Sequence, residues 1–118
     1  MAWYLYDQNM SGGYYFEPAF AVLVEADNPE EANRRAETVG IYFNGVEEGE
    51  DCECCGDRWI EQSRPLVDSK VAKFISSLKK ISEEDDYRIE KTVSVLDKSG
   101  DFTLYEAEDP YEVFALYP

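Results

Sequence analysis

The chain has 118 residues, no histidine, and 26 acidic against 11 basic side chains, which gives a formal net charge of −15 at pH 7. This length suits a single domain spanning residues 1–118 with one hydrophobic core. The negative charge repels phosphate backbones and anionic membranes, so we expect neither direct nucleic-acid binding nor membrane association.

The first part of the chain predicts two strands. Residues 2–7 are rich in aromatic side chains and predict a short strand, and the Ser-Gly-Gly sequence at 11–13 predicts a hairpin turn after it. The second half of residues 14–26 is apolar on both faces, which is typical of an interior strand.

A helix follows with clear start and stop signals. Asn28 suits the N-cap, Pro29 suits the first helical position, and Glu31 lies where a capping-box acid reaches back. We expect this helix to run to Val39 and to end at Gly40 in a left-handed conformation. After it, the Asn-Gly pair at 44–45 favours a type I′ turn.

The second half predicts a longer helix and further strands. Apolar residues from Val67 to Ile81 recur at helical spacing, with lysines on the outer face. Residues 87–95 alternate as a half-exposed strand, residues 102–107 predict its partner, and residues 111–117 predict a last strand or an ordered tail. The sequence therefore predicts an α+β fold, with two helices packed on one face of a mainly antiparallel sheet of about five strands.

Four segments of the first half, at 9–13, 24–37, 40–46 and 51–59, are similar to segments of known proteins. The last of them reads DCECCGDRW. Together they resemble a family of small bacteriophage proteins of uncharacterised function, over the first half of the chain. The resemblance implies a phage protein that acts in the cytoplasm of a bacterial host. By analogy with other phage accessory proteins, we expect a non-enzymatic protein that binds and inhibits a host defence protein. The lack of histidine and of a catalytic motif also argues against an enzyme.

An acidic run is the candidate surface for such a partner. Its six carboxylates fall within eleven residues: Glu47, Glu48, Glu50, Asp51, Glu53 and Asp57. Charge runs are usually solvated loops. A functional interpretation is that this surface imitates phosphate and occupies the basic groove of a host nuclease or another nucleic-acid-binding protein. The sequence does not exclude a homo-oligomer.

A second hypothesis is a sponge that sequesters a nucleotide-type signalling molecule. An arginine fork can hold a phosphate while an aromatic ring stacks on a base. The residues that would form this pocket are Arg34, Arg35, Tyr42, Arg58 and Trp59. The competing interpretation is a structural Asp57–Arg58 ion pair with Trp59 in the core.

A third hypothesis concerns the three cysteines, Cys52, Cys54 and Cys55. They could bind Zn²⁺ in a structural or interaction module, with Asp51 or Asp57 as a fourth ligand. Against this, structural zinc sites usually draw cysteine pairs from two segments. The alternative is that the thiols are reduced, inert and buried under Trp59. We expect no other cofactor.

Overall fold

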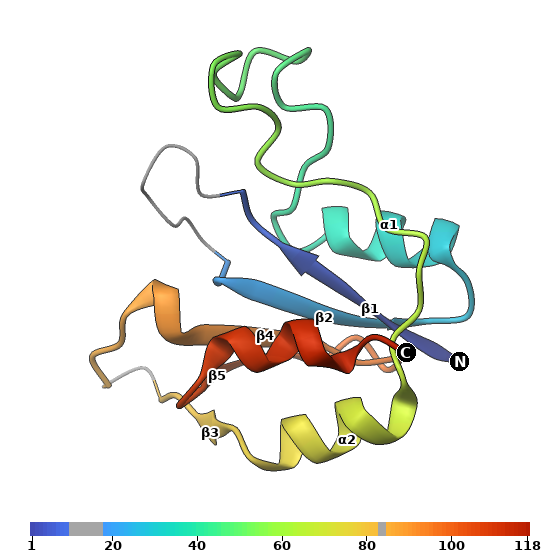
Figure 1. The fold of residues 1–118 in the computed structure, drawn as a ribbon, viewed down its shortest axis with the longest axis vertical. Coiled ribbons are helices and arrows are strands. Elements are labelled where there is room, and N and C mark those ends of the chain that lie inside the picture. The colour runs from blue at the N-terminus through green and yellow to red at the C-terminus, as the bar shows by residue number, and fades with distance from the viewer. Residues whose placement is uncertain (10–17, 83–84) are drawn as a thin grey trace.

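The computed structural model describes residues 1–9, 18–82 and 85–118 (Figure 1). Its elements in chain order are β1 (Ala2–Asp7), β2 (Ala21–Ala26), α1 (Pro29–Glu37), α2 (Asp68–Ser76), β3 (Lys79–Lys80), η1 (Ile89–Lys91), β4 (Thr92–Leu96), β5 (Phe102–Glu106) and η2 (Pro110–Leu116). The elements η1 and η2 are 3₁₀ helices. Within these residues the predicted α+β class is confirmed, and the sheet has five strands.

The strands form one mixed sheet in the order β1-β2-β4-β5-β3. Three of the pairings are antiparallel, whereas β2 and β4 run parallel. The sheet is therefore mainly antiparallel, as predicted, but not entirely so. A parallel pair needs a long crossover connection, and residues 27–91 provide it. This crossover contains α1, a long loop and α2.

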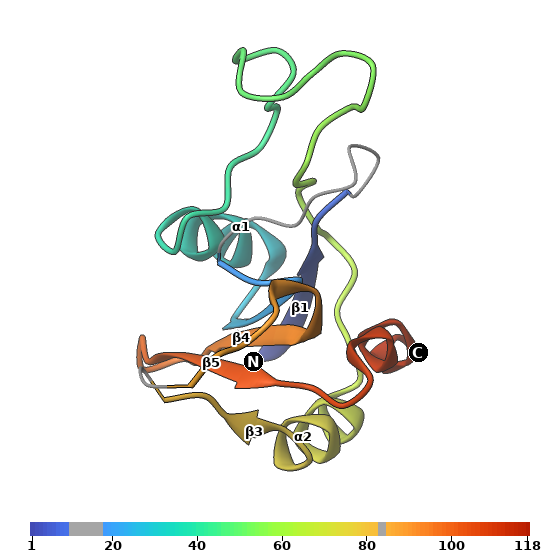
Figure 2. The ribbon, with the colours of Figure 1, turned by 90° about the vertical axis from the view of Figure 1, so that its left-hand side faces the viewer.

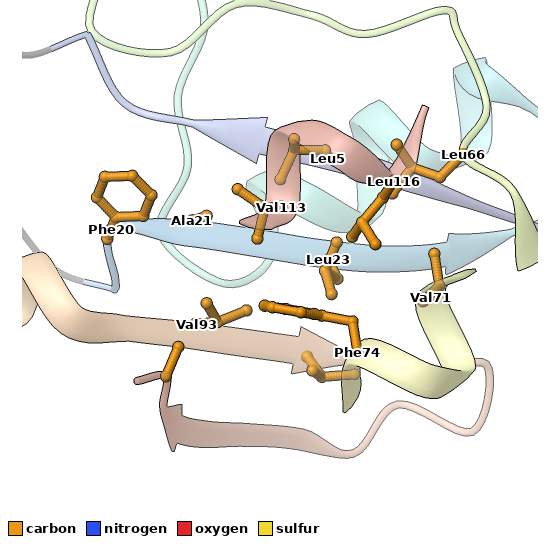
Figure 3. Packing of buried hydrophobic residues seen from close by; sticks show 12 residues of the cluster. Leu5, Phe20, Ala21, Leu23, Leu66, Val71, Phe74, Val93, Val113 and Leu116 are labelled. Atoms are coloured by element: carbon orange, nitrogen blue, oxygen red, sulfur yellow. The ribbon is translucent and has the colours of Figure 1, made fainter. Parts of the chain in front are cut away.

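Different helices cover the two faces of the sheet, so the prediction of two helices on one face is wrong. Leu23 of β2 lies in a cluster with Val71 of α2 and Val113 of η2, which Figure 3 shows. Its neighbour Val22 points to the other face and lies in a second cluster with Ala32 of α1. Figures 1 and 2 show α1 on one side of the sheet, with α2 and η2 on the other. The reason is that β2 is apolar on both faces, so helices must shield each face of the sheet from water.

The start of α1 is confirmed in detail. The backbone N–H of Glu31 donates to the side-chain oxygen of Asn28 at 2.8 Å, and the Glu31 carboxylate accepts from the N–H of Asp27 at 3.3 Å. These contacts satisfy donors that the first helical turn leaves free. The helix ends at Glu37, two residues before the predicted end, and Gly40 has the expected positive φ of 101°.

The helix α2 is shorter than the apolar spacing predicted. It ends at Ser76, and the chain from Lys79 to Lys80 forms β3 on the edge of the sheet beside β5. The hydroxyls of Ser76 and Ser77 donate back to the carbonyls of Lys73 and Phe74, at 2.7 and 2.6 Å. Such local bonds compete with helix continuation. The free edge of β5 then gives the next residues an alternative set of backbone partners.

The strand predicted at 87–95 does form and pairs with β5 as expected, but its predicted start and its predicted half-exposed face are wrong. The strand β4 begins only at Thr92, after η1, and all five of its residues are buried. It lies between β2 and β5, so both of its faces are covered. Residues 110–116 form the helix η2 rather than a strand, and Asp109 caps it by accepting from the N–H of Tyr111 at 3.1 Å.

Two predicted turns have different outcomes. The hairpin turn at 11–13 lies outside the described residues, although β1 and β2 do pair antiparallel. The type I′ turn at 44–45 is wrong, because such a turn needs positive φ at both central residues. Asn44 has a φ of 57°, but Gly45 is not among the residues with positive φ.

Candidate functional site

The largest irregular feature of the described chain is the segment of residues 44–58, which we call the acidic loop. Figures 1 and 2 show it extending away from the sheet at the end opposite α2. At its two bases, Ile41 and Trp59 are buried in the cluster beneath α1. No lysine or arginine lies between Arg35 and Arg58. All charged residues from 44 to 57 are therefore acidic, and the loop has apolar anchors at both ends.

Asp51 is the centre of the hydrogen bonds that shape this loop. Its carboxylate accepts from the Tyr42 hydroxyl at 2.8 Å and from the backbone N–H of Arg58 at 2.8 Å. The side chain is only 6% exposed. Gly45 passes so close that its carbonyl accepts from the N–H groups of Glu50 and Asp51, at 2.7 and 3.0 Å. Burial, followed by the bond to Asp51, raises the pKa of Tyr42, so this phenol stays protonated and keeps donating.

A second set of bonds joins the acidic loop to the end of β1. The side-chain amide of Asn9 donates to the carbonyl of Cys55 at 2.7 Å and to that of Asp57 at 3.3 Å. The backbone N–H of Asn9 donates to the carbonyl of Arg58 at 2.7 Å. Within the loop, the Asp57 carboxylate accepts from the N–H of Val46 at 2.9 Å. These bonds hold the loop in one shape against the repulsion of its charges.

The six predicted partner-binding acids divide into two groups. Asp51 and Asp57 point into the loop and hold its backbone. The four glutamates are exposed: Glu47, Glu48, Glu50 and Glu53. The sequence does not separate these roles. Aspartate is the usual residue for bonds to nearby backbone N–H groups, and this preference is the signal that could have separated them.

Only two residues of the predicted nucleotide pocket come together, because Tyr42 and Arg58 both contact the Asp51 carboxylate. The Arg58 guanidinium donates to the Gln8 side chain at 3.2 Å and lies 3.9 Å from Asp51, so its fork is already engaged. Trp59 is 1% exposed, which leaves no ring face for a ligand to stack on. The predicted Asp57–Arg58 ion pair is replaced by the Asp51–Arg58 pair, whereas the predicted burial of Trp59 is confirmed.

The other two arginines lie elsewhere. Arg35 donates to the backbone carbonyl of Asp97, and Arg34 is exposed on α1. Asp97 follows the C-terminal end of β4, which runs parallel to β2 and antiparallel to β1. Gln8, the partner of Arg58, follows the C-terminal end of β1. Arg35 and Arg58 thus bind groups at opposite ends of the sheet, a strand length of roughly 15–20 Å apart.

The three cysteines are on the surface, so the expectation that they are buried under Trp59 is wrong. Cys52 and Cys54 are exposed and Cys55 is partly exposed. All three Sγ atoms lie within 4.8 Å of one another, and those of Cys54 and Cys55 are 3.6 Å apart. Hydrogen bonds and charge from Cys52 and Cys55 raise the pKa of the Cys54 thiol to about 11. Asp51 and Asp57, the expected fourth ligands, are engaged within the loop.

Two residues of this site were missed from the sequence. Gln8 is buried directly after β1, where its amide donates to the carbonyl of Ala19 at 2.5 Å and its oxygen accepts from Arg58. Gly45 is required because a Cβ there would overlap the Asp51 carboxylate. The Asn-Gly pair drew attention to Gly45 as a turn residue, but no sequence pattern shows a contact with Asp51.

Comparison with known families gives a match over almost the whole chain. The model of a family described as "Domain of unknown function (DUF7296)" matches residues 1–113. No curated protein and no solved structure matches. The match includes residues beyond 63, for which the motifs showed no resemblance. In the part of the chain that the structure describes, no helix is long and apolar enough to cross a membrane.

Proposed function

Because the chain belongs to the domain family of unknown function DUF7296, whose description assigns no activity, we propose a function from the geometry of the acidic loop. The protein is a non-enzymatic binding module, and the four exposed glutamates of the loop contact a basic protein. The observation that carries this proposal is the division between two inward aspartates and four outward glutamates.

This division matters because it separates shape from recognition. A loop held by the Asp51 and Asp57 bonds presents its outer charges in a fixed arrangement, which reduces the entropy lost on binding. Arranged carboxylates steer a basic partner toward the loop and discriminate against acidic partners. A freely solvated charge run would not need two carboxylates and Asn9 to hold its backbone.

The chemistry of the surface supports one class of partner. Four exposed carboxylates with no cation from residue 36 to residue 57 resemble the charge of a phosphate backbone. We therefore propose a protein with a basic groove, such as a nuclease or another nucleic-acid-binding protein. The resemblance to bacteriophage proteins makes a bacterial host protein, inhibited by this contact, the expected partner.

The test is affinity capture from a bacterial lysate with two variants of equal net charge. In the loop variant, glutamine replaces Glu47, Glu48, Glu50 and Glu53. In the distal variant, the same number of exposed acids is neutralised elsewhere: Glu37→Gln, Asp101→Asn, Glu108→Gln and Glu112→Gln.

We expect the parent and the distal variant to capture the same basic protein, and the loop variant to lose it. Raised salt should release this protein, because exposed charges are screened beyond about 8–10 Å at physiological ionic strength. Equal capture by all three chains would contradict the proposal. A thermal shift of the parent with a nucleotide, abolished in Arg58→Ala, would support the sponge instead.

A further inference from the structure

We propose that Cys52, Cys54 and Cys55 bind one Zn²⁺ ion through three thiolate sulfurs in the acidic loop. This site goes beyond the binding function proposed above and does not depend on it. The observation is the convergence of the three Sγ atoms within 4.8 Å of one another.

The distances are close to those of a metal site. A Zn–S bond is about 2.3 Å, so two sulfurs on one tetrahedral ion are about 3.8 Å apart. The Sγ atoms of Cys54 and Cys55 are already 3.6 Å apart. An adjustment of about 1 Å, within the reach of side-chain rotation, brings the most distant pair to the same separation.

The backbone explains how one short segment supplies three ligands. The N–H groups of Cys55 and Gly56 both donate to the carbonyl of Cys52 at 3.1 Å, which closes a single tight turn. Gly56 has a φ of 81°, a conformation that L side chains rarely adopt, and it lets the chain leave the turn. Asn9 holds the turn from outside through the Cys55 carbonyl. The three sulfurs therefore lie close together because hydrogen bonds hold the turn that carries them.

The exposure of the thiols also favours a ligand role. Cysteine is among the residues most often buried, yet Cys52 and Cys54 are exposed. Thiolates bind soft and borderline cations such as Zn²⁺. The nearby exposed carboxylates of Glu50 and Glu53 add a negative potential that attracts a divalent cation. With three sulfur ligands, the fourth position of the tetrahedron is left for water.

Binding is a ligand exchange without a change of oxidation state. Each of the three thiols releases its proton to solvent, and three Zn–S bonds form while Zn²⁺ loses water from its hydration shell. The ion carries two positive charges against three thiolates, so the site gains a net charge of about −1. The turn at residues 52–56 becomes a closed ring of backbone and metal.

The test is a Zn²⁺ titration of the untagged full chain, stripped of metal and kept reduced, in competition with a chromophoric chelator. We expect one Zn²⁺ per chain. Co²⁺ in place of Zn²⁺ should give a thiolate-to-metal charge-transfer band. The change Cys54→Ser should lower the affinity for Zn²⁺ at least about 100-fold. Loss of a residue that only supports a metal ligand costs up to about 100-fold, so a larger loss indicates a direct ligand. The loop variant should change affinity less than about tenfold, since its carboxylates act only through their field.

Three results would overturn the proposal. They are a stoichiometry below one ion per chain, a Cys54→Ser chain that binds as tightly as the parent, and a loop variant that loses binding when Cys54→Ser does not. If the Cys54→Ser chain does not fold, a second assay tests the site in the parent chain. It measures whether added Zn²⁺ protects the thiols from an alkylating reagent. Protection of all three thiols supports the site, and unchanged alkylation refutes it.

Discussion

The carboxylate of Asp51 accepts a hydrogen bond from the backbone N–H of Arg58 at 2.8 Å, and its other oxygen lies 3.9 Å from the guanidinium of the same residue. Asp51 thus contacts both the main chain and the side chain of Arg58, at the far end of the acidic loop. The Tyr42 hydroxyl, from the near end, donates to the same carboxylate. Asp51 therefore joins the two ends of the loop.

The first prediction is that Asp51→Ala destabilises the protein by about 2 kcal/mol, because the Tyr42 hydroxyl and the Arg58 N–H lose their acceptor. Urea unfolding followed by circular dichroism gives the free energy. The control is the adjacent, exposed Glu50→Ala, which should stay within about 0.5 kcal/mol of the parent. Equal stability of Asp51→Ala and the parent would show that the carboxylate does not hold the loop.

The second prediction concerns Gly45. A Cβ there would overlap a carboxylate oxygen of Asp51 and lie 2.8 Å from the Tyr42 ring. Because Gly45 does not have a positive φ, the cost of Gly45→Ala comes from this overlap, and we expect about 1–3 kcal/mol. In an Asp51→Ala background the same change should cost less, with a coupling energy above about 0.5 kcal/mol in a double-mutant cycle. Additive costs would mean that the two residues do not meet.

The third prediction concerns Trp59, the apolar anchor at the far base of the loop. It is 1% exposed, and its indole N–H has no hydrogen-bond partner in the described structure. Trp59→Ala should cost about 3–5 kcal/mol by leaving a cavity. Trp59→Phe should cost less, about 1–2 kcal/mol, because the phenyl ring leaves a smaller cavity and the change removes a buried donor that makes no hydrogen bond. Chemical unfolding separates these cases, and an equal loss in both variants would argue against the buried position.

The fourth prediction is a pH dependence at Asp7. Burial raises the pKa of this carboxyl above its usual 3.8, so folding favours the protonated form. The folded state then holds its proton to higher pH than the unfolded state, and ionisation destabilises the fold as pH rises through this window. Asp7→Asn should therefore be more stable than the parent at pH 7, with the gain vanishing below about pH 3.8. Urea unfolding of both chains across this range measures the difference, and a gain that persists in acid would exclude ionisation as the cause.

The fifth prediction separates recognition from folding. The loop variant should be as stable as the parent or slightly more so, because its four side chains are exposed and repel one another. The distal variant should behave alike in thermal unfolding. A large loss of stability in the loop variant alone would show that these glutamates hold the loop, and its failure to capture a partner would then be a folding effect.

Much of the scaffold was predictable from short stretches. The N-cap of α1 and the apolar pattern of β2 are each encoded within a few neighbouring residues, and both predictions were confirmed. The end of α2 was not predictable, because the apolar spacing continues to Ile81 while the edge of β5 competes for Lys79 and Lys80. Lys79 and Lys80 can bond to the preceding turn of the helix or to β5, and β5 lies more than twenty residues away along the chain. A local sequence pattern does not show which of these partners is chosen.

The sequence by itself determined the charge of the acidic loop, the grouping of its cysteines, and the helix that precedes it. Only the tertiary structure decided that Asp51 and Asp57 turn inward, that Trp59 is buried away from the thiols, and that Arg35 and Arg58 lie at opposite ends of the sheet. The physical reason is distance along the chain. Composition and capping act between neighbours, whereas the contacts of Asn9 with Cys55 and the parallel pairing of β2 with β4 exist only once segments 46 and about 70 residues apart have met.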